Sequence, residues 1–153
     1  MKSSSPSPSS PLPVPKKDLA GVLELIRRMN AVVALPELLT FLTRETARML
    51  QAESTSILIY DPEHCELVAF VTTDGVPIRF DARLGIAGAT LTGGEPILVD
   101  NAQEDARFYG GVDRFTKKRT RTLMAVPLRC KEGHIIGVFE AINKKGGALP
   151  GGI

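Results

Sequence analysis

The chain has 153 residues, of which 43% are hydrophobic and 24% charged, and its formal net charge is +2. This length suits one domain with a real hydrophobic core, and it is too short for two. The nearly balanced charge gives no indication of a nucleic-acid or membrane surface, and no run reaches the about 18 apolar residues that a membrane helix needs. The two cysteines lack metal-binding spacing, so we expect reduced thiols, no metal site and a soluble cytoplasmic protein.

Residues 1–17 are rich in serine and proline, and such a segment buries too little apolar area to offset its ordering entropy. We therefore predict a disordered tail. A helical pattern begins at Asp18, and a second helix follows with Pro36 in its first turn. Two amphipathic helices in series usually pack on a sheet or on a second copy of themselves. The predicted inner face of the second helix consists of Leu35, Leu38, Leu39, Leu42, Thr46, Met49 and Leu50.

The pattern then changes from that of helices to that of strands. The first predicted strand, at 54–60, has apolar and β-branched residues on both faces, which indicates a central position in a sheet. Pro77 indicates an edge position for the third strand, because proline has no N–H to donate. The predicted strands, in chain order, are residues 54–60, 66–72, 76–80, 97–99, 123–128 and 135–142.

Two segments between the predicted strands differ from simple turns. Residues 85–92 have the pattern of a short helix that ends at glycines. Residues 100–121 form a long, polar, partly helical connection, and a connection of that length in a compact domain is usually functional. The basic residues at 117–121 have no aromatic residues among them and are more typical of a solvated loop than of a phosphate-backbone site. Residues 148–153 are predicted to be unstructured.

Four short motifs in the second half of the chain carry a family resemblance. They are Leu84-Gly-Ile-Ala-Gly88, Arg107-Phe-Tyr-Gly-Gly-Val-Asp113, Arg119-Thr-Arg121 and Gly137-Val-Phe-Glu-Ala-Ile-Asn-Lys144. Each alone is weak, because Gly-rich and apolar words recur by chance, but their order and spacing together are specific. The chain resembles a GAF domain, the small-molecule sensor module of cyclic-nucleotide phosphodiesterases, adenylyl cyclases and bacterial signalling proteins, over about residues 18–147.

The resemblance implies an α+β fold: a PAS/GAF-like central antiparallel sheet of about six strands, with N-terminal helices on one face and a ligand pocket on the other. It also implies a homodimer formed through the N-terminal helices. Family members that bind cyclic nucleotides carry an Asn-Lys dipeptide followed by a separated Phe, Asp and Glu. Asn143 and Lys144 match the dipeptide, but the chain stops where the Phe would fall, and the closing helix of the family is missing. We expect a fragment of a longer signalling protein or an early stop, which leaves the ion pair of Lys144 in question.

A cyclic nucleotide needs donors for its phosphate, polar groups for a purine edge and apolar walls for the ring. By resemblance, the backbone of Ile86 and Ala87 would hold the phosphate, joined by Tyr109. The N–H groups at a helix start form a ready anion site. The alternative is that the glycines around Ile86 only shape a turn.

Other candidate ligand contacts also come from the resemblance. Ser56 would contact the purine, and Asp74, with Thr73 as its rival, would read the edge of the base; a surface serine and an Asp-Gly turn are the alternatives. Glu140 would face the ligand, since a carboxylate inside a buried strand is costly unless something pairs with it; a solvent-facing edge position is the alternative. The remaining candidates, in the long connection, are Asp113, Thr116 and Thr120.

We therefore predict a non-catalytic regulatory sensor domain with no cofactor, which binds cyclic GMP or cyclic AMP and relays the signal to an output domain. A ligand-free GAF domain that dimerises or relays is the alternative. Some relatives reduce free methionine sulfoxide, but that chemistry needs a thiolate beside a resolving thiol, and Cys65 and Cys130 match neither family position. His64 and His134 fall in hairpin turns and have no nucleophile at a suggestive spacing.

Overall fold

The computed structural model describes residue 21 and residues 34–146. The predicted tail at 1–17, most of the predicted helix that begins at Asp18 and the predicted end at 148–153 lie outside the described residues. The chain divides after Leu38 into two compact units, and the second, residues 39–153, contains the sheet. The elements are α2 (Ala34–Leu50), β1 (Ala52–Asp61), β2 (Glu66–Thr72), β3 (Arg79–Asp81), α3 (Gly85–Gly93), β4 (Ile97–Val99), the 3-10 helix η2 (Ala102–Glu104), α4 (Gly111–Thr116), β5 (Leu123–Arg129) and β6 (Ile135–Lys144).

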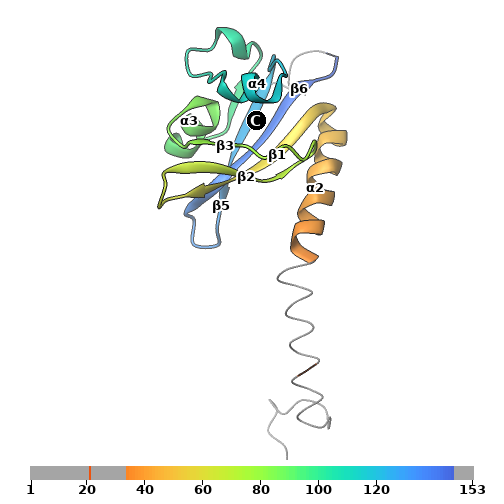
Figure 1. Cartoon of the computed structure of the whole chain (residues 1–153), viewed down its shortest axis with the longest axis vertical. Coiled ribbons are helices and arrows are strands. Elements are labelled where there is room, and N and C mark those ends of the chain that lie inside the picture. The colour runs from red at the N-terminus through yellow and green to blue at the C-terminus, as the bar shows by residue number, and fades with distance from the viewer. Residues whose placement is uncertain (1–20, 22–33, 147–153) are drawn as a thin grey trace, which may run out of the picture. The chain divides into compact units, whose positions relative to one another are not determined.

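A six-stranded antiparallel sheet in the order β3-β2-β1-β6-β5-β4 is the centre of this fold (Figure 1). The predicted α+β class is confirmed, and β1 and β6 are the central strands. The third strand is an edge strand, as Pro77 indicates, but it begins at Arg79 rather than at residue 76. Ile78 still contributes its carbonyl, which accepts a hydrogen bond from the Ala69 N–H at 2.8 Å.

The larger part of the core lies on the face of the sheet that α3 covers. Leu58, Leu67 and Val138 are almost wholly buried there with Ile86 of α3. Burying one such side chain contributes about 1.5–3 kcal/mol. Side chains alternate across a strand, so Ser54, Ser56 and Leu58 all point to this face. The opposite face has a smaller cluster around Met124 and Ala141.

The buried stripe of α2 differs from the predicted one. Thr43 and Ala47 are buried, and the Thr43 carbonyl accepts a buried hydrogen bond of 2.8 Å from the hydroxyl of Thr55 on β1. These small side chains let the helix backbone approach the strand. Of the predicted inner face, Leu39, Thr46 and Leu50 are half-buried, whereas Leu35, Leu38, Leu42 and Met49 are exposed. The predicted stripe therefore overlaps the buried one only in part: Leu39, Thr46 and Leu50 lie on the side of Thr43 and Ala47, and the other four residues do not.

Candidate small-molecule site

A cavity of about 70 Å³ lies between the sheet, the start of α3 and the segment 108–120. We call it the central cavity. The sequence spreads its candidate ligand contacts over more than eighty positions, and the fold brings all of them to this one space. They are Ser56, Asp74, Ile86, Ala87, Tyr109, Asp113, Thr116, Thr120 and Glu140. Thr73, the rival of Asp74, does not line it: its hydroxyl accepts from the Thr55 N–H and donates to Ser54.

The start of α3 supplies unpaired backbone donors at the cavity wall. Gly85, Ile86 and Ala87 line the cavity, and no side chain caps this helix end. The first N–H groups of any helix have no preceding turn to bond with, so they are free to hold an anion. Gly85 has a φ of +76°, which only glycine adopts without strain. Gly88 is also required, because a Cβ there would lie 2.7 Å from the Arg83 carbonyl carbon.

Asp113 fastens the connection that covers the cavity. Its carboxylate accepts hydrogen bonds from the Thr120 N–H at 2.8 Å and from the Thr120 hydroxyl at 2.6 Å. The amide of Gln103 donates a third, longer bond to it. Thr116 donates its hydroxyl to the Val112 carbonyl within α4. From the sequence, Asp113, Thr116 and Thr120 were expected to bind a ligand, but in this structure their polar groups form hydrogen bonds within the protein.

An ion pair joins the two sides of the cavity rim. The Lys118 ammonium lies 2.7 Å from the Asp74 carboxylate, with side chains 34% and 26% exposed. Burial raises the pKa of Asp74, but Lys118 and hydrogen bonds from Thr72 and the Val76 N–H outweigh that effect and leave the pKa below its usual value. The sequence did not indicate that Lys118 lies at the cavity, because the basic residues at 117–121 were interpreted as a solvated loop.

Tyr109 forms the outer wall of the cavity. Its ring is tilted by 39° against that of Phe80, with centroids 6.2 Å apart. The ring also lies against the bare backbone of Gly111, where a Cβ would come within 2.2 Å of the tyrosine oxygen. A second hollow, of about 320 Å³, lies on the other side of this wall and shares Ile78, Phe80, Tyr109 and Val112 with the central cavity.

Among the described lining residues, Glu140 is the carboxyl group without a partner. It lies on β6 between Ser56 of β1 and Ala125 of β5, with Val138 and Ile142 on the same face. Within the described chain its carboxyl has no hydrogen-bond or ion-pair partner. Burial among these largely apolar neighbours raises the pKa of Glu140 to about 7. The predicted alternative, a solvent-facing edge position, is wrong, because β6 is central in the sheet.

Asn143 has a structural role outside the cavity. It is buried with a φ of +58°, and its side-chain amide donates to the Arg119 carbonyl at 2.9 Å and to Glu53 at 3.0 Å. Its side-chain oxygen accepts from the Arg121 N–H at 2.6 Å. Asn143 therefore ties the end of the long connection to the sheet. The Lys144 side chain has no ion-pair partner among residues 34–146.

Some cavity residues were missed by the sequence. Ser54 and Ile142 lie two positions from Ser56 and Glu140, so strand periodicity alone could have found them. Phe80 and Phe108 had no comparable signal. Cys65 and Cys130 are both free thiols and neither lines the cavity.

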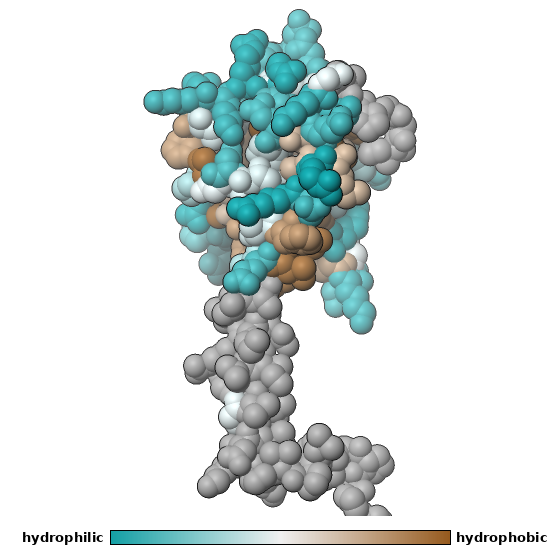
Figure 2. All heavy atoms as spheres, turned by 90° about the vertical axis from the view of Figure 1, so that its right-hand side faces the viewer, coloured by the Kyte–Doolittle hydropathy of each residue, from teal (hydrophilic) through white to brown (hydrophobic). Residues whose placement is uncertain are grey.

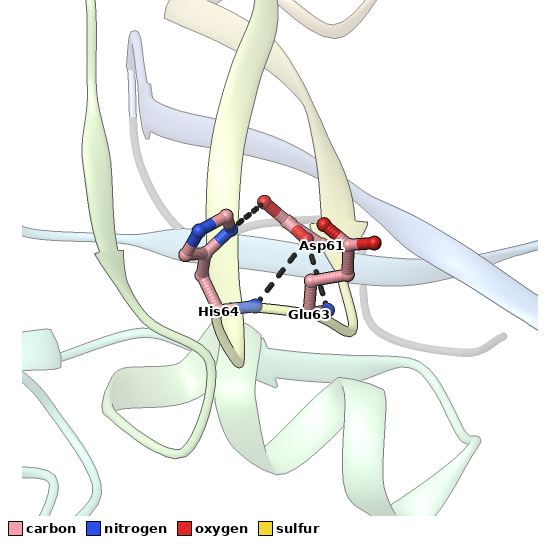
Figure 3. Close-up of side chains that lie close together, drawn as sticks. All are labelled: Asp61, Glu63 and His64. Atoms are coloured by element: carbon pink, nitrogen blue, oxygen red, sulfur yellow. Dashed lines mark hydrogen bonds and ion pairs between the residues drawn. The ribbon is translucent and has the colours of Figure 1, made fainter.

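Asp61, Glu63 and His64 come close together in the β1–β2 turn, as Figure 3 shows. One oxygen of Asp61 accepts from the backbone N–H groups of Glu63 and His64, and the other lies 2.8 Å from the His64 ring nitrogen. The side-chain bond to His64 is the main reason that the pKa of Asp61 is lowered. These contacts are those of an Asx turn, and they account for the cluster.

Comparison with known families identifies the class of protein. The family profile named "GAF domain" matches residues 34–150. The chain belongs to the GAF domain family. GAF domains are regulatory sensor domains, so the chain is a sensor rather than a catalytic domain. None of the helices in the described ranges is both long and apolar enough to cross a membrane.

Two curated relatives are phosphodiesterases. The chain is 29% identical to the probable 3',5'-cyclic phosphodiesterase pde-5 of Caenorhabditis elegans over 67% of this chain. It is 40% identical to the dual 3',5'-cyclic-AMP and -GMP phosphodiesterase 11 of Drosophila melanogaster over 41% of this chain. The matches span only 16% and 4% of the lengths of these relatives.

Solved structures share the fold at low sequence identity. The GAF domain of a phosphoenolpyruvate-protein phosphotransferase from Coxiella burnetii has a TM-score of 0.67 at 17% identity and covers 87% of this chain and 81% of its own. The free methionine-R-sulfoxide reductase of Neisseria meningitidis, solved with its substrate, has a TM-score of 0.63 at 17% identity and covers 92% and 81%. These likenesses establish the fold alone.

Proposed function

We propose that this sensor domain binds a cyclic nucleotide, cyclic GMP or cyclic AMP, in the central cavity and relays binding to an output domain of a longer signalling protein. The observation that carries the proposal is the convergence of nine separated candidate residues on one cavity. The names of both curated relatives, which are 3',5'-cyclic phosphodiesterases, support this ligand class.

The cavity offers suitable contacts for the phosphate, the sugar and the base of a cyclic nucleotide. The N–H groups of Ile86 and Ala87 would hold the phosphate, with the Tyr109 hydroxyl as an additional donor. Ser56 and Glu140 on the sheet would contact the sugar or the base. Asp74 would reach the edge of the base while keeping its ion pair with Lys118.

The small volume of the central cavity indicates that ligand binding moves the segment around Tyr109 and Val112 that covers it. Ligand pockets usually measure roughly 300–1,000 Å³, and the central cavity measures about 70 Å³. Outward displacement of Tyr109 and Val112 would join it to the neighbouring hollow of about 320 Å³. Binding would then shift α4, and a shift that depends on the ligand is what a relay needs.

A thermal-shift series tests the proposal. Cyclic GMP or cyclic AMP at a hundredfold excess over its dissociation constant should stabilise the domain by about 2.7 kcal/mol, while a cyclic dinucleotide serves as the comparison ligand. Glu140→Ala should abolish the shift. Tyr109→Phe should weaken it, and Tyr60→Phe, at the chain's other tyrosine, should not. No shift with either mononucleotide would contradict the proposal.

One observation favours a second function, in which the domain is a ligand-free scaffold that dimerises through α2. Phe41 is 59% exposed, Leu42 47% and Met49 77%. Figure 2 shows apolar surface among mostly hydrophilic side chains on the side of the molecule where α2 lies in Figure 1. Exposed apolar side chains at helical spacing are typical of helix–helix interfaces. Dimerisation through α2 would also be compatible with ligand binding, because no described residue of α2 lines the central cavity.

A further inference from the structure

The charges around the central cavity are unbalanced. Its described lining contains three carboxyl groups, those of Asp74, Asp113 and Glu140, and one ammonium, that of Lys118. Lys118 is committed to Asp74, and Asp113 is held by Thr120. Tyr109 is the other titratable group that faces this space, while the lining residues of α3 have no titratable side chain. Among the described lining residues, no side-chain cation is therefore left to meet an incoming anion.

The protonation state of Glu140 determines how favourably the cavity binds an anion. As a carboxylate, Glu140 would add its negative charge to that of the bound anion in a small, poorly solvated space, where like charges repel strongly. As a neutral acid it has an O–H to donate, and no protein group in the described chain takes that donor. Ser56 is its only polar cross-strand neighbour.

On the basis of the proposed function, we propose that the Glu140 carboxyl acts as a hydrogen-bond donor that selects an anionic ligand, so that binding takes up one proton at this residue. The free domain already holds Glu140 near the point of half-protonation at neutral pH, because burial raises its pKa to about 7. A phosphate bound at the start of α3 in the same cavity raises that pKa further, because it repels the negative charge of the ionised carboxylate. Affinity therefore depends on pH in the physiological range.

The test measures the dissociation constant of cyclic GMP, and separately of cyclic AMP, by isothermal titration calorimetry between pH 6 and pH 8.5. The dissociation constant of the wild type should be nearly flat at pH 6 and should rise toward tenfold per pH unit at pH 8.5, as linkage to one proton requires. Titrations at pH 8 in phosphate and in Tris, which differ in ionisation enthalpy, should show uptake of close to one proton.

Two variants assign the proton to Glu140. Glu140→Gln keeps an N–H donor that cannot ionise, so the dissociation constant of this variant should not depend on pH. Its binding enthalpy should be the same in phosphate and in Tris, because no proton is taken up. Glu95→Gln, at an exposed residue away from the cavity, should behave as the wild type does. Circular dichroism at each pH confirms that both variants are folded.

The outcomes separate this inference from the proposed function. Binding that is independent of pH in the wild type, binding that releases a proton, or an unchanged pH profile in Glu140→Gln would each overturn the inference and leave the cyclic-nucleotide site intact. No binding of either nucleotide at any pH would overturn both.

Discussion

Glu140 faces the central cavity, and the raised pKa of its carboxyl group has a consequence for stability as well as for binding. The folded state binds the proton of this carboxyl more tightly than the unfolded state does, since its pKa is raised from 4.5 to about 7. The contribution of Glu140 to the free energy of unfolding should therefore be fully present below pH 4.5 and be lost as the pH rises through 7.

We predict that Glu140→Gln raises the free energy of unfolding at pH 8 by up to about 3 kcal/mol, the energy equivalent of the pKa difference. The gain should shrink as the pH falls and vanish near pH 4.5. Urea unfolding at pH 5, 6.5 and 8 measures it. A variant that is equally less stable than the wild type at every pH would contradict the prediction.

Asn143 gives a second residue-scale prediction. Asn143→Ala leaves the Arg119 carbonyl and the Arg121 N–H without their partner and replaces a residue that tolerates a positive φ. We expect a loss of about 2–4 kcal/mol in the free energy of unfolding. Lys144→Ala is the matched control, because Lys144 uses its backbone N–H to bond Thr122, and it should cost less than about 1 kcal/mol. Equal losses in both variants would show that the side-chain bonds of Asn143 are unimportant.

At the scale of elements, the connection over the cavity is held by the hydrogen bonds between Asp113 and Thr120, which we call the clasp. Asp113 accepts the Thr120 N–H, which should protect that amide from hydrogen exchange. Asp113→Ala should speed exchange of the Thr120 amide by at least about tenfold, because losing a hydrogen bond to a charged group costs about 1.5–3 kcal/mol. Thr116→Val removes only a bond within α4 and should leave that amide unchanged. If the Thr120 amide exchanged equally fast in wild type and Asp113→Ala, the clasp would have no role.

The exposed side of α2 gives a prediction about assembly. If the domain dimerises through this helix, Leu42→Lys should convert dimers to monomers in sedimentation equilibrium, because it places a charge in an apolar interface. Its melting temperature at low protein concentration should stay close to that of the wild type. Arg44→Glu, on a different side of the helix, serves as the control. A wild-type chain that is monomeric at all concentrations would exclude the dimer.

Strand positions could be predicted closely from the sequence, and the contact face of α2 could not. The ranges 66–72 and 97–99 agree with β2 and β4, because alternation and turn residues mark strands directly. For α2, the pattern identified a helix but only part of its buried side, since the buried Thr43 and Ala47 make the contact through their small size. Hydrophobicity alone does not report such close backbone approach.

At the scale of the whole molecule, the nine candidate residues could be assigned to one site only through family resemblance. Spacing in the sequence gives no reason for Ile86, Tyr109 and Glu140 to meet, because the meeting depends on the strand order and on the path of residues 100–121. The pairing of Lys118 with Asp74 was likewise invisible, since the two lie 44 positions apart. Long-range side-chain pairs of this kind follow from the fold and not from local pattern.

The most direct test of the central claim is the change in backbone amide chemical shifts when cyclic GMP or cyclic AMP is added to the ¹⁵N-labelled domain. We expect the largest changes at Ile86, Ala87, Tyr109 and Thr120, and little change at Phe70 and Ile136, which lie exposed on the sheet and away from the cavity. The opposite pattern, or no change with either nucleotide at millimolar concentration, would contradict it.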